Sequence, residues 1–281
     1  MTPAEGSVQP PPRVTLDDLR QRRVSGPPIA MLTAYDHPTA AAAAAAGVDS
    51  LLIGDSLGCV LLGRPNTRGV PLELMVILGE AVRRGAPGVF LIGDVPFQSI
   101  SAGVAGVTLA ARRFVDESGC DAVKVEVGAD DAPLVDALVR QGVVTMAHLG
   151  LRPQTVLAPD GYRAQARDVR GVAQLVADCQ RMAAAGAQML LLEAVPHEAA
   201  AAVCAAVDVP VIGCGAGAAC HGHVVVTQDL LGWTAQRPPR FVPVAAQLHR
   251  EIERGLRTFV DDVHARRYPA AEHMYPMRAG E

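Results

Sequence analysis

The feature that most constrains the fold is a series of eight short apolar runs distributed along the chain. The runs are rich in Val, Ile and Leu and are apolar on both faces, as the buried strands of parallel sheets are. We therefore predict eight strands. The runs are Ile29–Thr33, Ser50–Gly54, Val89–Gly93, Ala122–Val127, Val143–Ala147, Met189–Leu192, Val209–Gly213 and Val224–Thr227.

Helical patterns separate these runs. Apolar residues three or four positions apart form one stripe from Val172 to Met182 and another from Leu248 to Phe259, which is the pattern of an amphipathic helix. The run Ala40–Ala46 has maximal helix propensity. Strands that alternate with helices predict an α/β protein, a (β/α)8 TIM barrel, which typically takes about 250 residues. A doubly wound open sheet is the alternative.

The predicted barrel is one domain over residues 14–267, because no linker-like segment interrupts this range. Residues 1–13 are rich in proline and are predicted to form a disordered N-terminal tail. Residues 268–281 are predicted to form a C-terminal tail.

The composition argues against several classes of protein. The chain has 25 Lys and Arg against 29 Asp and Glu, a net charge of −4, which argues against nucleic acid or an anionic membrane as the main partner. No apolar stretch is long enough to span a bilayer, and no secretory signal is recognisable. Six cysteines without a CxxC spacing predict reduced thiols and a cytoplasmic location. A small-molecule enzyme is the leading class.

Polar residues close five of the apolar runs. Asp55 and Asp94 each follow an Ile-Gly pair. Lys124 and Glu126 lie two positions apart, so they point to the same face of their strand. The remaining strand ends carry His148 and Glu193. In a parallel barrel all these ends meet at one mouth, where barrel active sites are built.

The acidic groups at this mouth predict a bound cation. Four carboxylates facing one ammonium would repel one another unless a cation neutralised them. Oxygen ligands favour Mg²⁺ over zinc, and open coordination positions would suit a bidentate 2-oxo acid. Each residue alone has a structural alternative: Asp55 and Glu193 as helix caps, Asp94 in a loop, His148 in the core. Their repetition at five strand ends favours a site.

Lys124 is the only lysine among the 25 basic residues, and it lies inside an apolar run where a charge is costly. A compact ammonium cannot be replaced by a guanidinium in a tight site, so we expect a functional role. Two weaker features stay open. Gly213–Gly217 is either a phosphate cradle or a place of close backbone packing, and His221 with His223 is a metal-like spacing that is common by chance.

At these residues the chain resembles the ketopantoate hydroxymethyltransferase (3-methyl-2-oxobutanoate hydroxymethyltransferase) family. The resemblance covers roughly residues 14–262. It implies a TIM barrel of the phosphoenolpyruvate-binding superfamily and a homo-oligomer, a decamer in well-known members. The matching strings are Leu-Thr-Ala-Tyr-Asp36, Gly-Asp55-Ser56-Leu-Gly, Asp94-Val-Pro-Phe97, Val-Lys124-Val-Glu126, His148-Leu-Gly-Leu, Leu-Leu-Glu193-Ala-Val-Pro and Ile-Gly-Cys-Gly-Ala-Gly217.

The resemblance also implies a reaction. A hydroxymethyl group would pass from 5,10-methylenetetrahydrofolate to the enolate of 3-methyl-2-oxobutanoate, giving 2-dehydropantoate in pantothenate biosynthesis. A Mg²⁺ ion bound to the 2-oxo acid would act as a Lewis acid that stabilises the enolate.

The resemblance assigns roles to individual residues as well. Asp55 and Asp94 would hold Mg²⁺ and so bind substrate, with Glu126 in or near the coordination shell. Ser56 and Lys124 would bind the substrate carboxylate and oxo group, and Lys124 would offset the charge that grows on the enolate. The catalytic residues would be Glu193 as the base, Lys124 and His148, which either donates a proton or orients the substrate.

The chain departs from the usual family sequence in three segments around the predicted mouth, residues 63–82, 160–166 and 221–223. These segments bear on the recognition of folate and of the substrate side chain more than on the type of reaction. An alternative is therefore a paralogue that performs Mg²⁺-enolate chemistry, by hydroxymethyl transfer or by a C–C lyase or aldol reaction, on another 2-oxo acid. A non-catalytic barrel that binds a metabolite or protein is a third hypothesis, against which the retained Lys124 argues.

Overall fold

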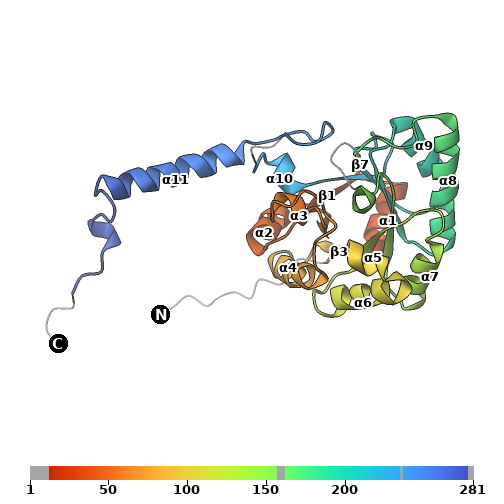
Figure 1. Ribbon diagram of the computed structural model, residues 1–281, viewed down its shortest axis with the longest axis horizontal. Coiled ribbons are helices and arrows are strands. Elements are labelled where there is room, and N and C mark those ends of the chain that lie inside the picture. The colour runs from red at the N-terminus through yellow and green to blue at the C-terminus, as the bar shows by residue number, and fades with distance from the viewer. Residues whose placement is uncertain (1–12, 157–161, 235–236, 278–281) are drawn as a thin grey trace. The chain divides into compact units, whose positions relative to one another are not determined.

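The computed structural model describes residues 13–156, 162–234 and 237–277. Eight parallel strands form a closed barrel in which neighbours follow chain order, and helices surround it (Figure 1). The strand β1 pairs with β8, so the sheet has no free edge. This closure confirms the predicted (β/α)8 barrel and excludes the open doubly wound sheet.

All eight predicted strands are present, β1 with its predicted bounds and the others with shifts of up to three residues at their ends. The segment Val143–Ala147 begins before the observed strand β5, which continues through His148 to Gly150. The strands are β1 (Ile29–Thr33), β2 (Ser50–Ile53), β3 (Phe90–Asp94), β4 (Ala122–Glu126), β5 (Thr145–Gly150), β6 (Met189–Glu193), β7 (Val211–Cys214) and β8 (Gly222–Val225).

Helices follow the strands and pack their apolar faces on the barrel wall. The predicted stripe from Val172 to Met182 lies in α8, and its Leu175 and Met182 are buried. Asp36 and Asp168 cap two helices by accepting hydrogen bonds from backbone N–H groups of the first turn. The helices are α1 (Leu16–Val24), α2 (His37–Ala45), α3 (Leu57–Val60), α4 (Leu72–Gly85), α5 (Phe97–Ser101), α6 (Gly103–Asp116), α7 (Ala132–Arg140), η1 (Pro153–Thr155), α8 (Val169–Ala184) and α9 (His197–Ala206).

The core has two layers because strand side chains alternate between the faces of the wall. Outward-facing residues such as Leu91 and Val123 pack against the helices. Inward-facing residues such as Ile92 and Met146 fill the barrel interior together with Leu19 of α1. The interior is therefore packed below the mouth, and α1 closes its amino end.

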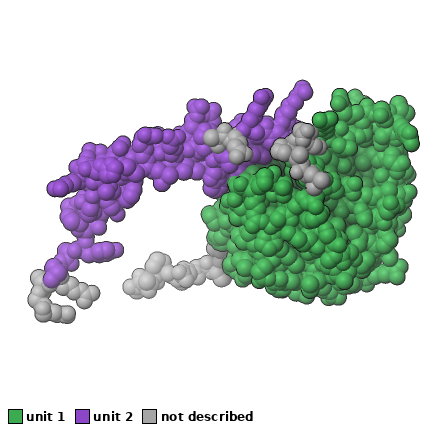
Figure 2. Space-filling view, viewed as in Figure 1, with its two compact units in different colours: residues 1–227 green, residues 228–281 purple. Residues whose placement is uncertain are grey.

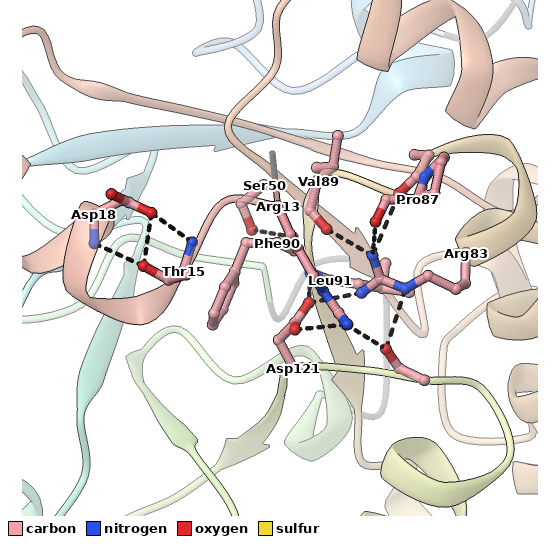
Figure 3. Close-up of polar contacts among 12 residues, drawn as sticks. Arg13, Thr15, Asp18, Ser50, Arg83, Pro87, Val89, Phe90, Leu91 and Asp121 are labelled. Atoms are coloured by element: carbon pink, nitrogen blue, oxygen red, sulfur yellow. Dashed lines mark hydrogen bonds and ion pairs between the residues drawn. The ribbon is translucent and has the colours of Figure 1, made fainter. Parts of the chain in front are cut away.

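A charged network around Asp121 connects the amino ends of β3 and β4 with α4 (Figure 3). Asp121 accepts hydrogen bonds from Arg83 Nη2 at 2.6 Å and from the backbone N–H of Leu91 at 2.8 Å. Arg13 lies 2.7 Å from the same carboxylate. Arg13, which the sequence placed in a disordered tail, is therefore anchored to the barrel. Residues 1–12 of that predicted tail lie outside the described residues.

The chain divides into two compact units, residues 1–227 and 228–281 (Figure 2). The first contains all eight strands. The second contains α11 (Leu248–His264) and η3 (Ala271–His273), with α10 (Thr227–Leu230) at the division. The division lies inside the range 14–267 that was predicted to be one domain, and that prediction stays open. Among the described residues no helix is long and apolar enough to cross a membrane.

The helix α11 confirms the second predicted amphipathic stripe, but it buries none of its side chains. Leu256 and Phe259 are 63% and 53% exposed. Tyr268, which lies in the predicted C-terminal tail, packs edge-on against Phe259 with ring centroids 5.1 Å apart. The last four residues of that tail lie outside the described residues.

Candidate active site

The structure brings the predicted polar residues to the carboxyl ends of five neighbouring strands. Side chains two positions apart on a strand point to the same face. Asp94 follows the inward-facing Ile92 by two positions, and Glu193 follows Leu191 in the same way. Four of the polar residues are placed like this, and they therefore face the barrel interior. The polar residues are Asp55 after β2, Asp94 at the end of β3, Lys124 and Glu126 in β4, His148 in β5 and Glu193 at the end of β6.

Lys124 and Asp94 form a buried ion pair at the centre of this group. The two side chains are 4% and 1% exposed, and Lys124 Nζ lies 2.8 Å from Asp94 Oδ1. Burial raises the pKa of Asp94 to about 7, although the Lys124 ammonium opposes this shift. Burial alone would lower the pKa of Lys124, but the surrounding carboxylates, led by Asp94, raise it above its usual value. Lys124 therefore keeps its charge at any physiological pH.

His148 lies between Lys124 and Glu193. Its Nδ1 is 3.2 Å from Lys124 Nζ, and its Nε2 is 3.3 Å from Glu193 Oε2. Burial lowers the pKa of His148 well below its usual value, and the Lys124 charge lowers it further, so the ring is neutral. A lysine ammonium can only donate. Nδ1 must then accept, which assigns the ring proton to Nε2, on the side of Glu193.

Glu193 is the most accessible acid of the group. Its side chain is 17% exposed, whereas that of Glu126 is 3% exposed. Burial raises the pKa of Glu193 to about 8, with Lys124 acting in the opposite direction. A carboxylate with a pKa near neutral pH is suited to accept a proton from carbon and later release it. The geometry therefore fits the predicted base.

Gln154 is a site residue that the sequence analysis missed. It lies in η1, just after β5, and is 2% exposed. Its Nε2 donates to Asp55 Oδ2 at 2.9 Å, and its backbone N–H donates to Glu126 Oε2 at 3.1 Å. A neutral residue in a loop carries no periodic signal. Its closeness to His148 along the chain is the only hint in the sequence.

Residues 13–271 match the ketopantoate hydroxymethyltransferase family. The 3-methyl-2-oxobutanoate hydroxymethyltransferase of Desulfotalea psychrophila is 42% identical to this chain over 263 residues, which are 94% of each protein. The enzyme of the same name from Bacillus subtilis is 40% identical over 265 residues, 94% of this chain and 95% of that protein. The chain belongs to the ketopantoate hydroxymethyltransferase family. This membership confirms the predicted family and the predicted enzyme class, a hydroxymethyltransferase.

Solved structures that resemble this ketopantoate hydroxymethyltransferase family member share its fold. Phosphoenolpyruvate phosphomutase from Streptomyces platensis superposes with a TM-score of 0.60 at 16% identity, over 93% of this chain and 92% of that chain. A 2,3-dimethylmalate lyase of the PEP mutase/isocitrate lyase superfamily gives 0.57 at 18% identity, over 93% and 92%. At these identities the likeness shows the barrel fold alone.

Ser56, a predicted substrate-binding residue of this family member, lies beside the acidic group. Its Oγ is 2.8 Å from the hydroxyl of Tyr35, which is fully buried in the segment between β1 and α2. Gly54 makes room for it, since a Cβ at Gly54 would lie 2.9 Å from Ser56 Oγ. Tyr35 is a second neighbour of the site to which the sequence analysis assigned no role.

The donor set of the family member fits a hard cation. Among the described residues no three His, Cys, Asp or Glu side chains already form a metal-binding group. The Asp55 backbone N–H donates to Asp94 Oδ2 at 2.9 Å, so the two predicted ligands do adjoin. Buried carboxylates outnumber the single Lys124 ammonium, and the buried Gln154 Oε1 has no hydrogen-bond partner. Oxygen atoms and excess negative charge suit Mg²⁺.

The first of the two weaker sequence features, Gly213–Gly217, lies next to this group, because Cys214 pairs with Glu193 between β7 and β6. A Cβ at Gly217 would lie 2.7 Å from His197 Cβ, so this glycine permits close packing on α9. His221 Nδ1 accepts the backbone N–H of Val211 at 3.0 Å, while His223 is exposed on β8. These contacts favour backbone packing at Gly213–Gly217 and a structural role for His221.

Proposed function

We propose that this chain transfers a hydroxymethyl group from 5,10-methylenetetrahydrofolate to the enolate of 3-methyl-2-oxobutanoate. The product is 2-dehydropantoate, an intermediate of pantothenate biosynthesis. Family membership over residues 13–271 supports the reaction type. The observation that carries the proposal is the buried chain of contacts from Asp94 through Lys124 and His148 to Glu193.

The substrate-binding residues follow from the positions of the charges. Asp55 and Asp94 would hold Mg²⁺, with Glu126 in or near its coordination shell. When bound, the ion supplies Lewis acidity that stabilises an enolate. Ser56 and Lys124 would bind the carboxylate and the oxo group of the substrate, and the permanent charge of Lys124 would offset the negative charge that grows on the enolate oxygen.

Glu193 would remove the proton from C3 of the substrate. Its accessible position at the end of β6 and its raised pKa suit this step. The neutral His148 would present its Nε2 proton on the side of Glu193, 3.3 Å from Oε2, and Nε2 has no other hydrogen-bond partner among the described residues. The electron pair left on C3 forms the new bond to the methylene carbon, both carbon–nitrogen bonds of that carbon break, and one water molecule supplies the hydroxyl group. The proton from C3 and one proton from the water pass to the two nitrogen atoms, so that tetrahydrofolate leaves.

The proposal is tested by two assays on the full chain. Protein mixed with Mg²⁺, methylenetetrahydrofolate and 3-methyl-2-oxobutanoate is expected to form 2-dehydropantoate. In D₂O without folate, it is expected to exchange the C3 hydrogen of the same acid, and Glu193→Gln is expected to abolish this exchange. Folded protein that gives neither product nor exchange would overturn the proposal.

A second candidate, the same chemistry on another 2-oxo acid, is favoured by one contact in a departing segment. Within residues 63–82, the Arg68 guanidinium stacks over the Phe97 ring at 3.8 Å. This places a cation beside the helix that follows Asp94. A panel of 2-oxo acids in the exchange assay separates the candidates, because exchange with another acid and none with 3-methyl-2-oxobutanoate would select the second.

We also propose a homo-oligomer, decameric as in the family, and a cytoplasmic location. Support for association comes from α11, a helix of 17 residues that buries none of its side chains. Its apolar stripe, which includes Ile252, Leu256 and Phe259, is 38% to 63% exposed. Burial of such a stripe against a second copy would be strongly favourable. Light scattering on the purified protein measures the mass of the assembly.

A further inference from the structure

Gln154 touches every strand end that carries a proposed cation ligand. Its side-chain Nε2 donates to Asp55 Oδ2 at 2.9 Å, beyond β2, and to the carbonyl oxygen of Val95 at 3.0 Å, directly after Asp94. Its backbone N–H donates to Glu126 at the end of β4. One uncharged residue thus connects three neighbouring strands, although Asp55 lies 99 positions away along the chain.

The orientation of the Gln154 amide is fixed by its partners. The carbonyl of Val95 can only accept a hydrogen bond, and the same nitrogen of the amide that lies 3.0 Å from it lies 2.9 Å from Asp55 Oδ2. The NH₂ group must therefore face them, and Oε1 points elsewhere. This oxygen is buried and has no partner among the described residues. Buried polar atoms almost always have a hydrogen-bond partner. We therefore expect this oxygen to accept a hydrogen bond from, or to bind, a ligand or a water molecule at the site.

We propose that Gln154 is a positioning residue that fixes the spacing of Asp55 and Glu126 for a divalent cation. The inference rests on the proposed function, because it requires that a cation binds there. An amide suits the task, since it donates to a carboxylate oxygen without adding a positive charge that would compete with the cation. Residues that orient metal ligands typically contribute about 10- to 100-fold to metal affinity.

The test uses Mn²⁺ as a probe, with binding to the full chain measured by electron paramagnetic resonance. Gln154→Met keeps the length of the side chain and removes the donor to Asp55. It is expected to raise the Kd for Mn²⁺ by about tenfold or more. Gln188→Met is the matched control, because Gln188 accepts the backbone N–H of Thr145 at 2.9 Å at the amino end of the strands. The control is expected to bind Mn²⁺ as the wild type does.

A second variant covers the case in which Gln154→Met does not fold. Gln154→Asn keeps the amide but is one methylene shorter, so it cannot reach Asp55, and it is expected to weaken Mn²⁺ binding as well. Circular dichroism verifies the fold of each variant. A high Mg²⁺ concentration is expected to restore part of the activity of the Gln154 variants.

The outcomes separate the two proposals. If the wild type binds Mn²⁺ and a folded Gln154 variant binds it with the same Kd, the role of Gln154 is refuted while the proposed function stands. If the folded wild type binds no Mn²⁺, the cation is absent from the function and the role of Gln154 falls with it.

Discussion

Lys124 has its ammonium 2.8 Å from an Asp94 oxygen and 3.2 Å from His148 Nδ1. Both neighbours are buried, so the space around the ammonium is set by packed side chains. The other 24 basic residues of the chain are arginines. A guanidinium is larger and planar and would displace one of these neighbours. At the residue scale, shape is therefore as important as charge.

Lys124→Arg is expected to keep the fold and lose about 100-fold or more in kcat/KM, because the donor that stabilises the developing oxyanion is misplaced. The measurement is the rate of 2-dehydropantoate formation at saturating folate. The control is Arg140→Lys, which exchanges the same two residue types where the side chain is 77% exposed. This variant is expected to have the kcat/KM of the wild type. Turnover of Lys124→Arg within twofold of the wild type would contradict the role of the lysine.

The raised pKa of Glu193 predicts a pH dependence. Burial holds this carboxyl protonated up to about pH 8, and only the ionised form can accept a proton from C3. The exchange rate in D₂O is therefore expected to rise about ninefold from pH 6 to pH 7, to reach half of its plateau near pH 8 and to level off above about pH 9. In Glu193→Gln, in which the exchange is expected to be abolished, no such rise with pH is expected. A rate in the wild type that is constant from pH 5 upward would rule out Glu193 as the base.

At the scale of secondary-structure elements, the position of Asp94 depends on how α6 packs against β3. Gly93 lies directly under the ring of Phe114, and a Cβ there would be 2.4 Å from the ring. The missing side chain lets the helix approach the strand just before the acidic residue. At Asp94 the Ile-Gly-Asp pattern thus marks a close helix contact as well as a strand end, whereas at Asp55 the glycine makes room for Ser56 Oγ.

Gly93→Ala is expected to destabilise the fold by about 1–3 kcal/mol, since neither the ring nor the strand can move freely. Urea unfolding measures this difference. The control is Gly255→Ala on α11, where a Cβ meets nothing within 4 Å and helix propensity favours alanine by about 1 kcal/mol. Equal stability of Gly93→Ala and the wild type would mean that α6 is not packed this closely.

The strands were predictable from sequence because buried parallel strands leave apolar runs, of which Val224–Thr227 is the least distinct. The error at β5 has a physical reason. The prediction stopped at Ala147, just before His148, whereas the strand continues to Gly150. A polar residue that faces the mouth is part of the strand, but it interrupts the apolar run by which the strand is recognised.

At the scale of the whole molecule, the site joins residues that the sequence separates widely. The charged members were predictable, because each closes an apolar run and parallel topology brings such ends together. Gln154 and the Tyr35–Ser56 contact were not, since they depend on how loops fold over the mouth. No local pattern reports a hydrogen bond between Gln154 and Asp55.

The exposed stripe of α11 predicts that assembly depends on this helix. Leu256→Glu is expected to lower the mass measured by light scattering, because it places a charge on the surface proposed to be buried. Thr258→Glu, on the same helix but away from the stripe, adds the same charge and is expected to leave the mass unchanged. An unchanged mass for Leu256→Glu would show that α11 does not hold the copies together.

The pairing of β1 with β8 has a consequence for how the protein folds during its synthesis. Gly222 and its neighbours supply the backbone groups that seal the sheet against Ile29 and Met31. During translation, the barrel cannot close until the segment through Val225 has left the ribosome, although the segments carrying Asp55 to Glu193 emerge earlier. Until then the first strand has an open edge, which is the kind of surface that chaperones shield from aggregation.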